Sequence, residues 1–177
     1  RIPDPDVTKL ATGEEITAEY NHTKQPLKAK VGDEVIYTLR IYNEGDLAGY
    51  AEEVVDHLPI GLKYVDDEFN QSYGWSLDED GRTVRTSYLS KANEKNGENL
   101  LQAFNGETLD YVDIRIKCVI TEDAQVNVKL TNIVEIAKDA DENGKDIDDR
   151  DSKKEAKIPS DEDLPKYKDD EIRKPYI

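Results

Sequence analysis

Two polar residues, Asp56 and Asn132, fall where the surrounding pattern predicts buried apolar side chains. Val54, Asp56 and Leu58 share one parity in a predicted strand, and Asn132 shares its parity with the apolar positions of segment 126–136. A buried carboxamide without a hydrogen-bond partner costs about 1–3 kcal/mol, so we expect both side chains to be partnered. A Lys could be the third member of this site, because its amine is neutral in apolar surroundings and can then attack the Asn132 carboxamide. The Asp56 carboxyl would transfer the proton, and ammonia would leave. The product would be an intramolecular isopeptide bond.

A purely structural interpretation of the same two residues is also open. Asn132 could hydrogen-bond a neighbouring backbone at a bulge or strand end, and Asp56 could cap the turn formed by Pro59, Ile60 and Gly61. One bulge would also change the parity of a short strand. The residue pattern by itself therefore does not decide between the two interpretations.

The elements that would position these residues are strands, because apolar and polar residues alternate with a period of two up to about residue 136. A single helical turn is predicted around Asn99–Phe104. The predicted strands are separated by turn signals and cover residues 35–42, 50–55, 62–65, 84–88, 112–118 and 126–136. Many short strands with regular turns indicate an all-β fold, an antiparallel β-sandwich.

The charge of the chain excludes several classes of protein. Its 177 residues include 24 Lys and Arg against 40 Asp and Glu, a formal net charge of −16, and no basic cluster stands out. Nucleic acid and anionic membranes would be repelled from such a surface. The sequence contains no run of ~18 apolar residues, so we expect no segment of it to span a membrane. Because the chain opens on Arg1 without a signal-like segment, we expect it to be a piece of a longer protein.

The chain is also poor in residues for catalysis. It has one Cys, so it can form no internal disulfide and no Cys-based metal site. His57 lies next to Asp56, but no Ser or Cys in an elbow motif is there for such a dyad to activate, so we expect no enzyme activity on external substrates. Cys118 continues the inward stripe of the strand at 112–118 and is expected to be a small buried hydrophobe.

Composition changes after residue 136. Residues 137–177 include 14 acidic and 10 basic residues and three prolines, so this part can bury little apolar surface. We therefore predict one domain, a sandwich core over residues 1–136, which a terminal hairpin could extend to about residue 152. Residues 153–177 are expected to form an acidic linker or extension.

Three motifs, in this order, resemble the conserved repeat domain of Gram-positive bacterial surface proteins, a domain of unknown function related to Cna-type fimbrial isopeptide-forming domains. They are Val31–Gly45 (VGDEVIYTLRIYNEG), Val55–Leu62 (VDHLPIGL) and Leu130–Ile136 (LTNIVEI), within a match that covers residues 28–136. The resemblance implies an immunoglobulin-like antiparallel β-sandwich. It also implies a non-catalytic structural or adhesive stalk module, extracellular at the cell surface or wall, whose partners are neighbouring modules of the same chain.

The resemblance further implies roles for single residues. The D-x-L-P motif falls on Asp56, which would be the proton shuttle, and the N-x-x-E-I motif falls on Asn132, which would be the acceptor. In the family the reactive Lys lies on the first strand, and Lys9 is the only early Lys in a strand-like context. A first strand upstream of Arg1 is the alternative, and it would place the reactive Lys outside this chain.

An acidic segment, residues 139–151, begins like an EF-hand calcium loop. Asp139, Asp141, Asn143 and Gly144 occupy the first, third, fifth and sixth places, but Arg150 stands where the bidentate Glu is required. A calcium site of another kind, with Asp139, Asp141 and Asn143 as ligands, is one interpretation. A solvated hairpin that turns at Asn143-Gly144 is the other.

Tyr73 and Trp75 form the aromatic part of a possible ligand site. Exposed side by side, they would suit an adhesin head that recognises a glycan or a host protein. Alternatively, Trp75 fills the core of the sandwich. The exposure of the Trp75 indole distinguishes the two interpretations.

Overall fold

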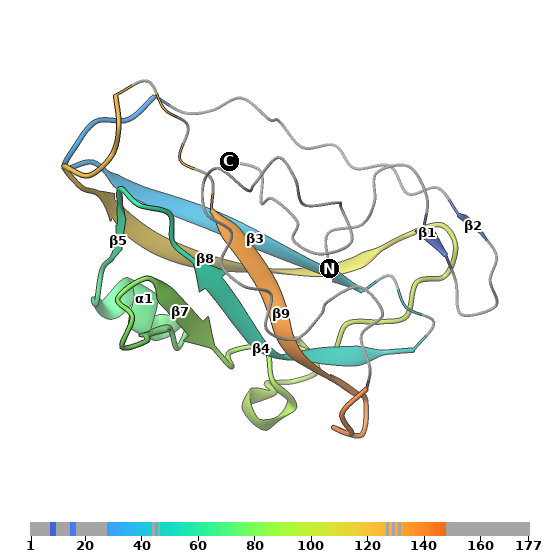
Figure 1. Cartoon of the computed structure of the whole chain (residues 1–177). Helices are drawn as coiled ribbons and strands as arrows, with labels where there is room; N and C mark the ends of the chain where they lie inside the picture. The colour runs from blue at the N-terminus through green and yellow to red at the C-terminus, as the bar shows by residue number, and fades with distance from the viewer. Residues whose placement is uncertain are drawn as a thin grey trace.

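The computed structural model of the chain describes residues 28–43, 45, 47–126, 128, 130 and 132–147, and the backbone of two short strands before them. These two strands, β1 (Thr8–Lys9) and β2 (Glu15–Ile16), pair with each other in antiparallel orientation. Strands dominate the described part of the chain, and the long ones are β3, β4, β8 and β9 (Figure 1).

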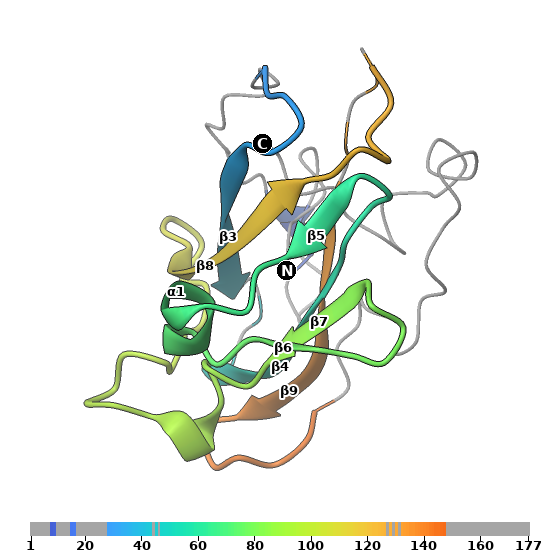
Figure 2. The ribbon, with the colours of Figure 1, turned by 90° about the vertical axis from the view of Figure 1, so that its left-hand side faces the viewer.

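Two antiparallel sheets make up the body of the molecule. The first has the order β3 (Glu34–Asn43), β8 (Asp110–Ile120) and β5 (Leu62–Tyr64). The second has the order β6 (Ser76–Leu77), β7 (Thr83–Thr86), β4 (Gly49–His57) and β9 (Ile133–Asp141). The two sheets lie against each other, as the views of Figures 1 and 2 agree, and the apolar core between them draws on both. The predicted all-β sandwich is confirmed.

The core follows the predicted alternation in the two longest strands. On β3 the inward residues are Tyr37, Leu39 and Ile41, and on β8 they are Ile114, Ile116 and Cys118. Cys118 is a buried free thiol, and burial raises its pKa. The period of two therefore predicted correctly which residues of β3 and β8 face the core, because side chains alternate between the two faces of a strand.

Segment 126–136 differs from its prediction as a single strand. Val126 and Val128 are 87% and 54% exposed, and the ladder begins only at Ile133. Backbone hydrogen bonds from Ala124 to Thr121 and from Val128 to Gln125 close turns just after β8, and Val126 and Val128 lie outside the sheet.

The helical prediction at residues 99–104 is wrong. Leu101 in that segment instead forms an isolated antiparallel bridge with Gly49. The α-helix is α1 (Glu68–Ser72), and a short 3-10 helix covers Lys91–Asn93. A side-chain cap starts α1, since Asp67 Oδ1 accepts a hydrogen bond from Asn70 N at 3.0 Å, and such a cap can support one turn without any apolar periodicity.

The last strand extends beyond residue 136. β9 runs to Asp141, and the chain then turns so that Ala140 bridges Asp146. Residues 153–177, predicted to be an acidic linker, lie outside the described residues, as do the side chains of residues 1–27. The domain limits stay predictions.

Gly61, in the turn before β5, packs closely against Ala124, in the turn after β8. Gly61 has φ +99°, and a Cβ added to it would lie 2.7 Å from the Cα of Ala124. We expect Gly61→Ala to lower the free energy of unfolding by more than about 1 kcal/mol, because the substitution adds a steric clash to an unfavourable φ. Urea unfolding measures the change. The control is Gly32→Ala, at φ +88° with no atom within 4 Å of the added Cβ, and an equal loss in both variants would contradict the role of close packing.

Candidate functional site

Asp56 and Asn132 meet in the interior. Asp56 lies near the end of β4, Asn132 immediately precedes β9, and both are 0% exposed. Asn132 Nδ2 donates a hydrogen bond to Asp56 Oδ2 at 2.7 Å. Asp56 pairs with Val134 in the β4–β9 ladder, so Asn132 approaches it diagonally, two residues before that partner. The structure thus brings together two residues that are 76 positions apart in the sequence.

Each member of the pair has one oxygen for which the described residues provide no hydrogen-bond partner. Asp56 Oδ1 and Asn132 Oδ1 are both buried, and no hydrogen-bond donor reaches either of them within the part of the chain that the structure describes. A buried polar atom left this way costs about 1–3 kcal/mol. The described residues therefore form a site that is short of a hydrogen-bond donor.

The surroundings of Asp56 favour its neutral form. Burial raises its pKa from 3.8 to about 7, against the opposing effects of the Asn132 hydrogen bond and the nearby His57. The charge of Asp56 contributes in turn to the raised pKa of Tyr37 and of Cys118, although burial is the largest cause in both. A carboxyl with a pKa near neutrality can both accept and return a proton, which is the property required of a shuttle.

Lys9 is the third residue predicted for this site. Its backbone lies in β1, where it pairs with Glu15 of β2. Its side chain lies outside the described residues, so the role of Lys9 as the amine donor stays a prediction.

Trp75 belongs to the core. Its side chain is 4% exposed, and Nε1 donates to the backbone oxygen of Arg115 at 2.7 Å. Tyr73 packs against Phe69 and Tyr88, with ring centroids 5.7 and 5.4 Å away. The indole is therefore not available to a glycan or a host protein, which favours the core-filling interpretation of Trp75.

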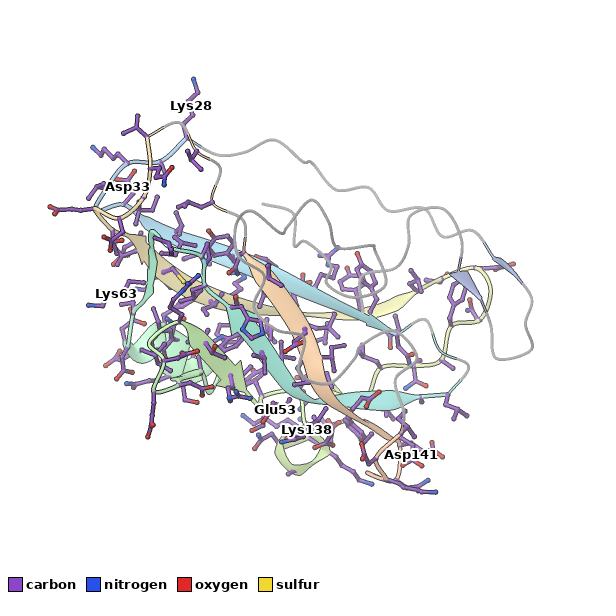
Figure 3. All side chains as sticks on the ribbon, in the orientation of Figure 1. Lys28, Asp33, Glu53, Lys63, Lys138 and Asp141 are labelled. Carbon is purple, nitrogen blue, oxygen red and sulfur yellow. The ribbon has the colours of Figure 1, made fainter. Side chains whose placement is uncertain are left out.

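The predicted calcium ligands lie at the end of β9, where Figure 3 labels Asp141. Asp141 Oδ1 accepts hydrogen bonds from the backbone amides of Asn143 at 2.8 Å and Lys145 at 2.9 Å, which lower its pKa. Among the described residues, no group of three or more His, Cys, Asp or Glu is arranged to hold a metal ion. Asp141 thus organises the turn at Asn143-Gly144, and calcium binding by Asp139, Asp141 and Asn143 stays a prediction.

Asn70 is a buried polar residue that the sequence pattern did not reveal. Its Nδ2 donates to the backbone oxygens of Val65 at 2.6 Å and Lys117 at 2.8 Å, and its Oδ1 accepts from Lys117 N at 2.8 Å. The two contacts with Lys117 tie α1 to β8, and the contact with Val65 ties α1 to the residue that follows β5. The Asp67-x-x-Asn70 spacing is a helix N-cap signal that could have indicated the helix, but not the contact with β8.

His57 and Glu135 form a second contact between β4 and β9. His57 Nε2 lies 3.1 Å from Glu135 Oε1, and both side chains are largely buried. The sequence places His57 beside Asp56 but gives no sign of Glu135, because their proximity depends on the register of the two strands.

No helix in the described residues is both long enough and apolar enough to cross a membrane.

No protein-family model matches the chain, and no curated protein matches it. Among solved structures, the chain is similar to the pilus backbone (RrgB) from Streptococcus pneumoniae, at 17% sequence identity and a TM-score of 0.37. The similarity covers 75% of this chain and 51% of the other, so the chain spans about half the length of that pilus protein.

Proposed function

We propose that the chain is a non-catalytic structural module of a bacterial cell-surface protein, stiffened by an isopeptide bond between Lys9 and Asn132. The observation that carries the proposal is the buried Asp56–Asn132 pair. It is hydrogen-bonded at 2.7 Å, and each residue has one oxygen that no described residue partners. The resemblance of three sequence motifs to surface-protein repeat domains supports the extracellular location.

The reaction is an amide exchange within one chain. The neutral Nζ of Lys9 attacks Cγ of Asn132, the new Nζ–Cγ bond forms, and the Cγ–Nδ2 bond breaks. Asp56 accepts a proton from the attacking amine and returns it to Nδ2, which leaves as ammonia. Asp56 ends in its starting state, and no oxidant, metal or second substrate enters the balance.

A lysine amine would also complete the hydrogen bonding of the site. Its N–H groups are the donors that Asp56 Oδ1 and Asn132 Oδ1 lack among the described residues. After the reaction the new amide N–H is a donor to the Asp56 carboxyl. The product would therefore bury fewer unpartnered polar atoms than the unreacted pair.

The cross-link would suit a stalk segment that transmits force between neighbouring modules. The chain has a single Cys, so no internal disulfide can tie it together. A bond from Lys9 to Asn132 would join the start of the chain to the residue before the last described strand. A force applied to the ends of the module would then act on the covalent bond before it acts on the strands that lie between Lys9 and Asn132 in the chain.

Intact mass spectrometry of the purified chain tests the proposal. We expect a mass lower than the sequence mass by one ammonia, and a peptide map in which the peptides holding Lys9 and Asn132 are joined. The Lys9→Ala chain is the control and should keep the full sequence mass. An unshifted mass in the unsubstituted chain, or a link from Asn132 to another Lys, would contradict the proposal.

A further inference from the structure

Two diagonal contacts cross the β4–β9 ladder at the same place, on opposite faces. Asp56 pairs with Val134 and His57 pairs with Ile133 in the ladder. Asp56 reaches Asn132 on the core face, and His57 reaches Glu135 on the other face, because consecutive side chains of a strand alternate between faces. The His57–Glu135 contact therefore joins the same two strands directly behind the Asp56–Asn132 pair, on the opposite face of the sheet.

His57 contacts polar groups on two neighbouring strands. Asp80 is held as a carboxylate, because hydrogen bonds led by that of Thr83 lower its pKa to about 2. The Thr83 hydroxyl donates to Asp80 Oδ2 at 2.6 Å, and its oxygen lies 3.4 Å from His57 Nδ1. His57 Nε2 faces the Glu135 carboxyl at 3.1 Å. Each ring nitrogen of His57 therefore faces an oxygen atom on a neighbouring strand.

The His57 side chain links three strands. It contacts Glu135 on β9 and Thr83 on β7, while His57 itself belongs to β4. The charged groups around it are Glu135, Asp80 behind Thr83, Asp56 on its own strand, and Arg82, whose Nε donates to the backbone oxygen of Leu58.

Asn132 depends on this part of the ladder for its position. It lies one residue before β9 begins, and the described residues Val126, Val128 and Leu130 before it are not paired as a strand. Register shifts interrupt the β4–β9 ladder between Ala51 and Val54, so only the pairing at 54–57 holds the start of β9 to β4. A contact that fixes Glu135 to His57 therefore also limits the movement of Asn132 relative to Asp56.

We infer that His57 and Glu135 are a positioning pair that holds Asn132 against Asp56 for the cross-linking reaction. The inference rests on the proposed function. Neither residue touches the reacting atoms, and both act through the register of β4 and β9.

The test is the rate of ammonia loss after refolding, followed by intact mass in the full chain. We expect His57→Gln and Glu135→Gln to slow the reaction by at least about tenfold, because small displacements of reacting groups have large effects on rate. Lys138→Gln is the matched control, since Lys138 also bridges β9 to β4 through Glu53, at 3.2 Å, but away from the site; Figure 3 labels both residues. This control should react at the rate of the unsubstituted chain.

Two further measurements separate positioning from general stability. His57→Arg places a guanidinium opposite Glu135, and this variant should react faster than His57→Gln. In His57→Gln the pH profile of the reaction should move to higher pH, because the charge of His57 lowers the pKa of Asp56. Glu135→Gln keeps His57 and should not show this upward shift.

The possible failures are distinguishable. If the unsubstituted chain keeps its full mass, the proposed function fails. The alternative is that the unsubstituted chain reacts. If His57→Gln and Glu135→Gln then react as fast as the unsubstituted chain, while circular dichroism shows that they are folded, the positioning role is overturned. The unreactive Lys9→Ala chain provides a separate readout, the hydrogen exchange of the Asn132 side-chain amide by NMR. His57→Gln should accelerate this exchange, and unchanged exchange would overturn the inference as well.

Discussion

The Asp56→Ala variant is expected to fold into the same sandwich, to keep its ammonia and to melt at a clearly lower temperature. The substitution removes the only carboxyl that hydrogen-bonds Asn132 among the described residues, and with it the group that moves the proton from the amine to the leaving nitrogen. The core itself is apolar and extends over both sheets, so we expect the fold to survive. Intact mass and a thermal melt measure the two effects together.

The expected loss of stability comes mainly from the missing cross-link. A bond from Lys9 to Asn132 would close a loop of more than one hundred residues, and the chain-entropy argument used for disulfides gives about 4–5 kcal/mol for a loop of this size. In a domain of this length, that corresponds to a melting temperature lower by roughly 10–20 °C. Asn132→Ala should show the same full mass and a similar shift, because it removes the acceptor instead of the shuttle.

Asp123→Ala is the control for the loss of an aspartate as such. Asp123 is exposed in the turn after β8, and its variant should still lose ammonia and melt near the temperature of the unsubstituted chain. A cross-linked Asp56→Ala chain would show that Asp56 is not the shuttle. An uncross-linked chain with an unchanged melting temperature would show that the bond does not stabilise the module.

The fold could be predicted where one local rule decided the outcome. On β3 and β8 the alternation of apolar and polar residues continues for many positions, and the buried faces follow it. The burial of Asp56 followed from the same rule, since Val54, Asp56 and Leu58 all face inward. Long strands with one solvated face are the case in which sequence parity is most informative.

Asn132 shows how a correct expectation can rest on a partly wrong element. Its burial was predicted from a continuous strand over residues 126–136, but Val126 and Val128 are exposed and the strand starts at Ile133. Asn132 is buried because it immediately precedes the ladder and meets Asp56 there. The turns closed by the backbone hydrogen bonds of Ala124 and Val128 are local features with no strong Gly or Pro signal in the sequence.

Contacts that depend on register or packing could not be predicted. The indole of Trp75 bonds a backbone oxygen of β8, Asn70 bonds the same strand, and His57 meets Glu135 across 78 positions. Each pair requires the relative placement of two elements, which a single sequence does not provide. The same limit applies to Lys9, which the resemblance names and whose side chain lies outside the described residues.

A chain that cannot form the bond, Lys9→Ala, is expected to lose stability as the pH rises from about 4 to about 7. Asp56 has a pKa of about 7 in the fold, against an ordinary value of 3.8 in the unfolded chain. Between these values the folded chain holds a proton that the unfolded chain has released, so the free energy of unfolding falls as the pH rises. The stabilisation is complete below the unfolded pKa and is lost above the folded one. The shift corresponds to about 4 kcal/mol over this window.

Urea unfolding at several pH values, in Lys9→Ala and in Lys9→Ala with Asp56→Asn, isolates this contribution. The control is needed because a chain with net charge −16 also repels itself less at low pH. Asparagine resembles the neutral carboxyl and does not titrate, so the double variant should keep only the background slope. Equal slopes in the two chains would contradict a raised pKa for Asp56.

In the cross-linked chain the new amide N–H can donate to the ionised carboxyl of Asp56, so the dependence of its stability on pH should be weaker than that of Lys9→Ala. The bond would then stabilise the module at neutral pH twice, by closing the chain and by providing a partner for the Asp56 charge.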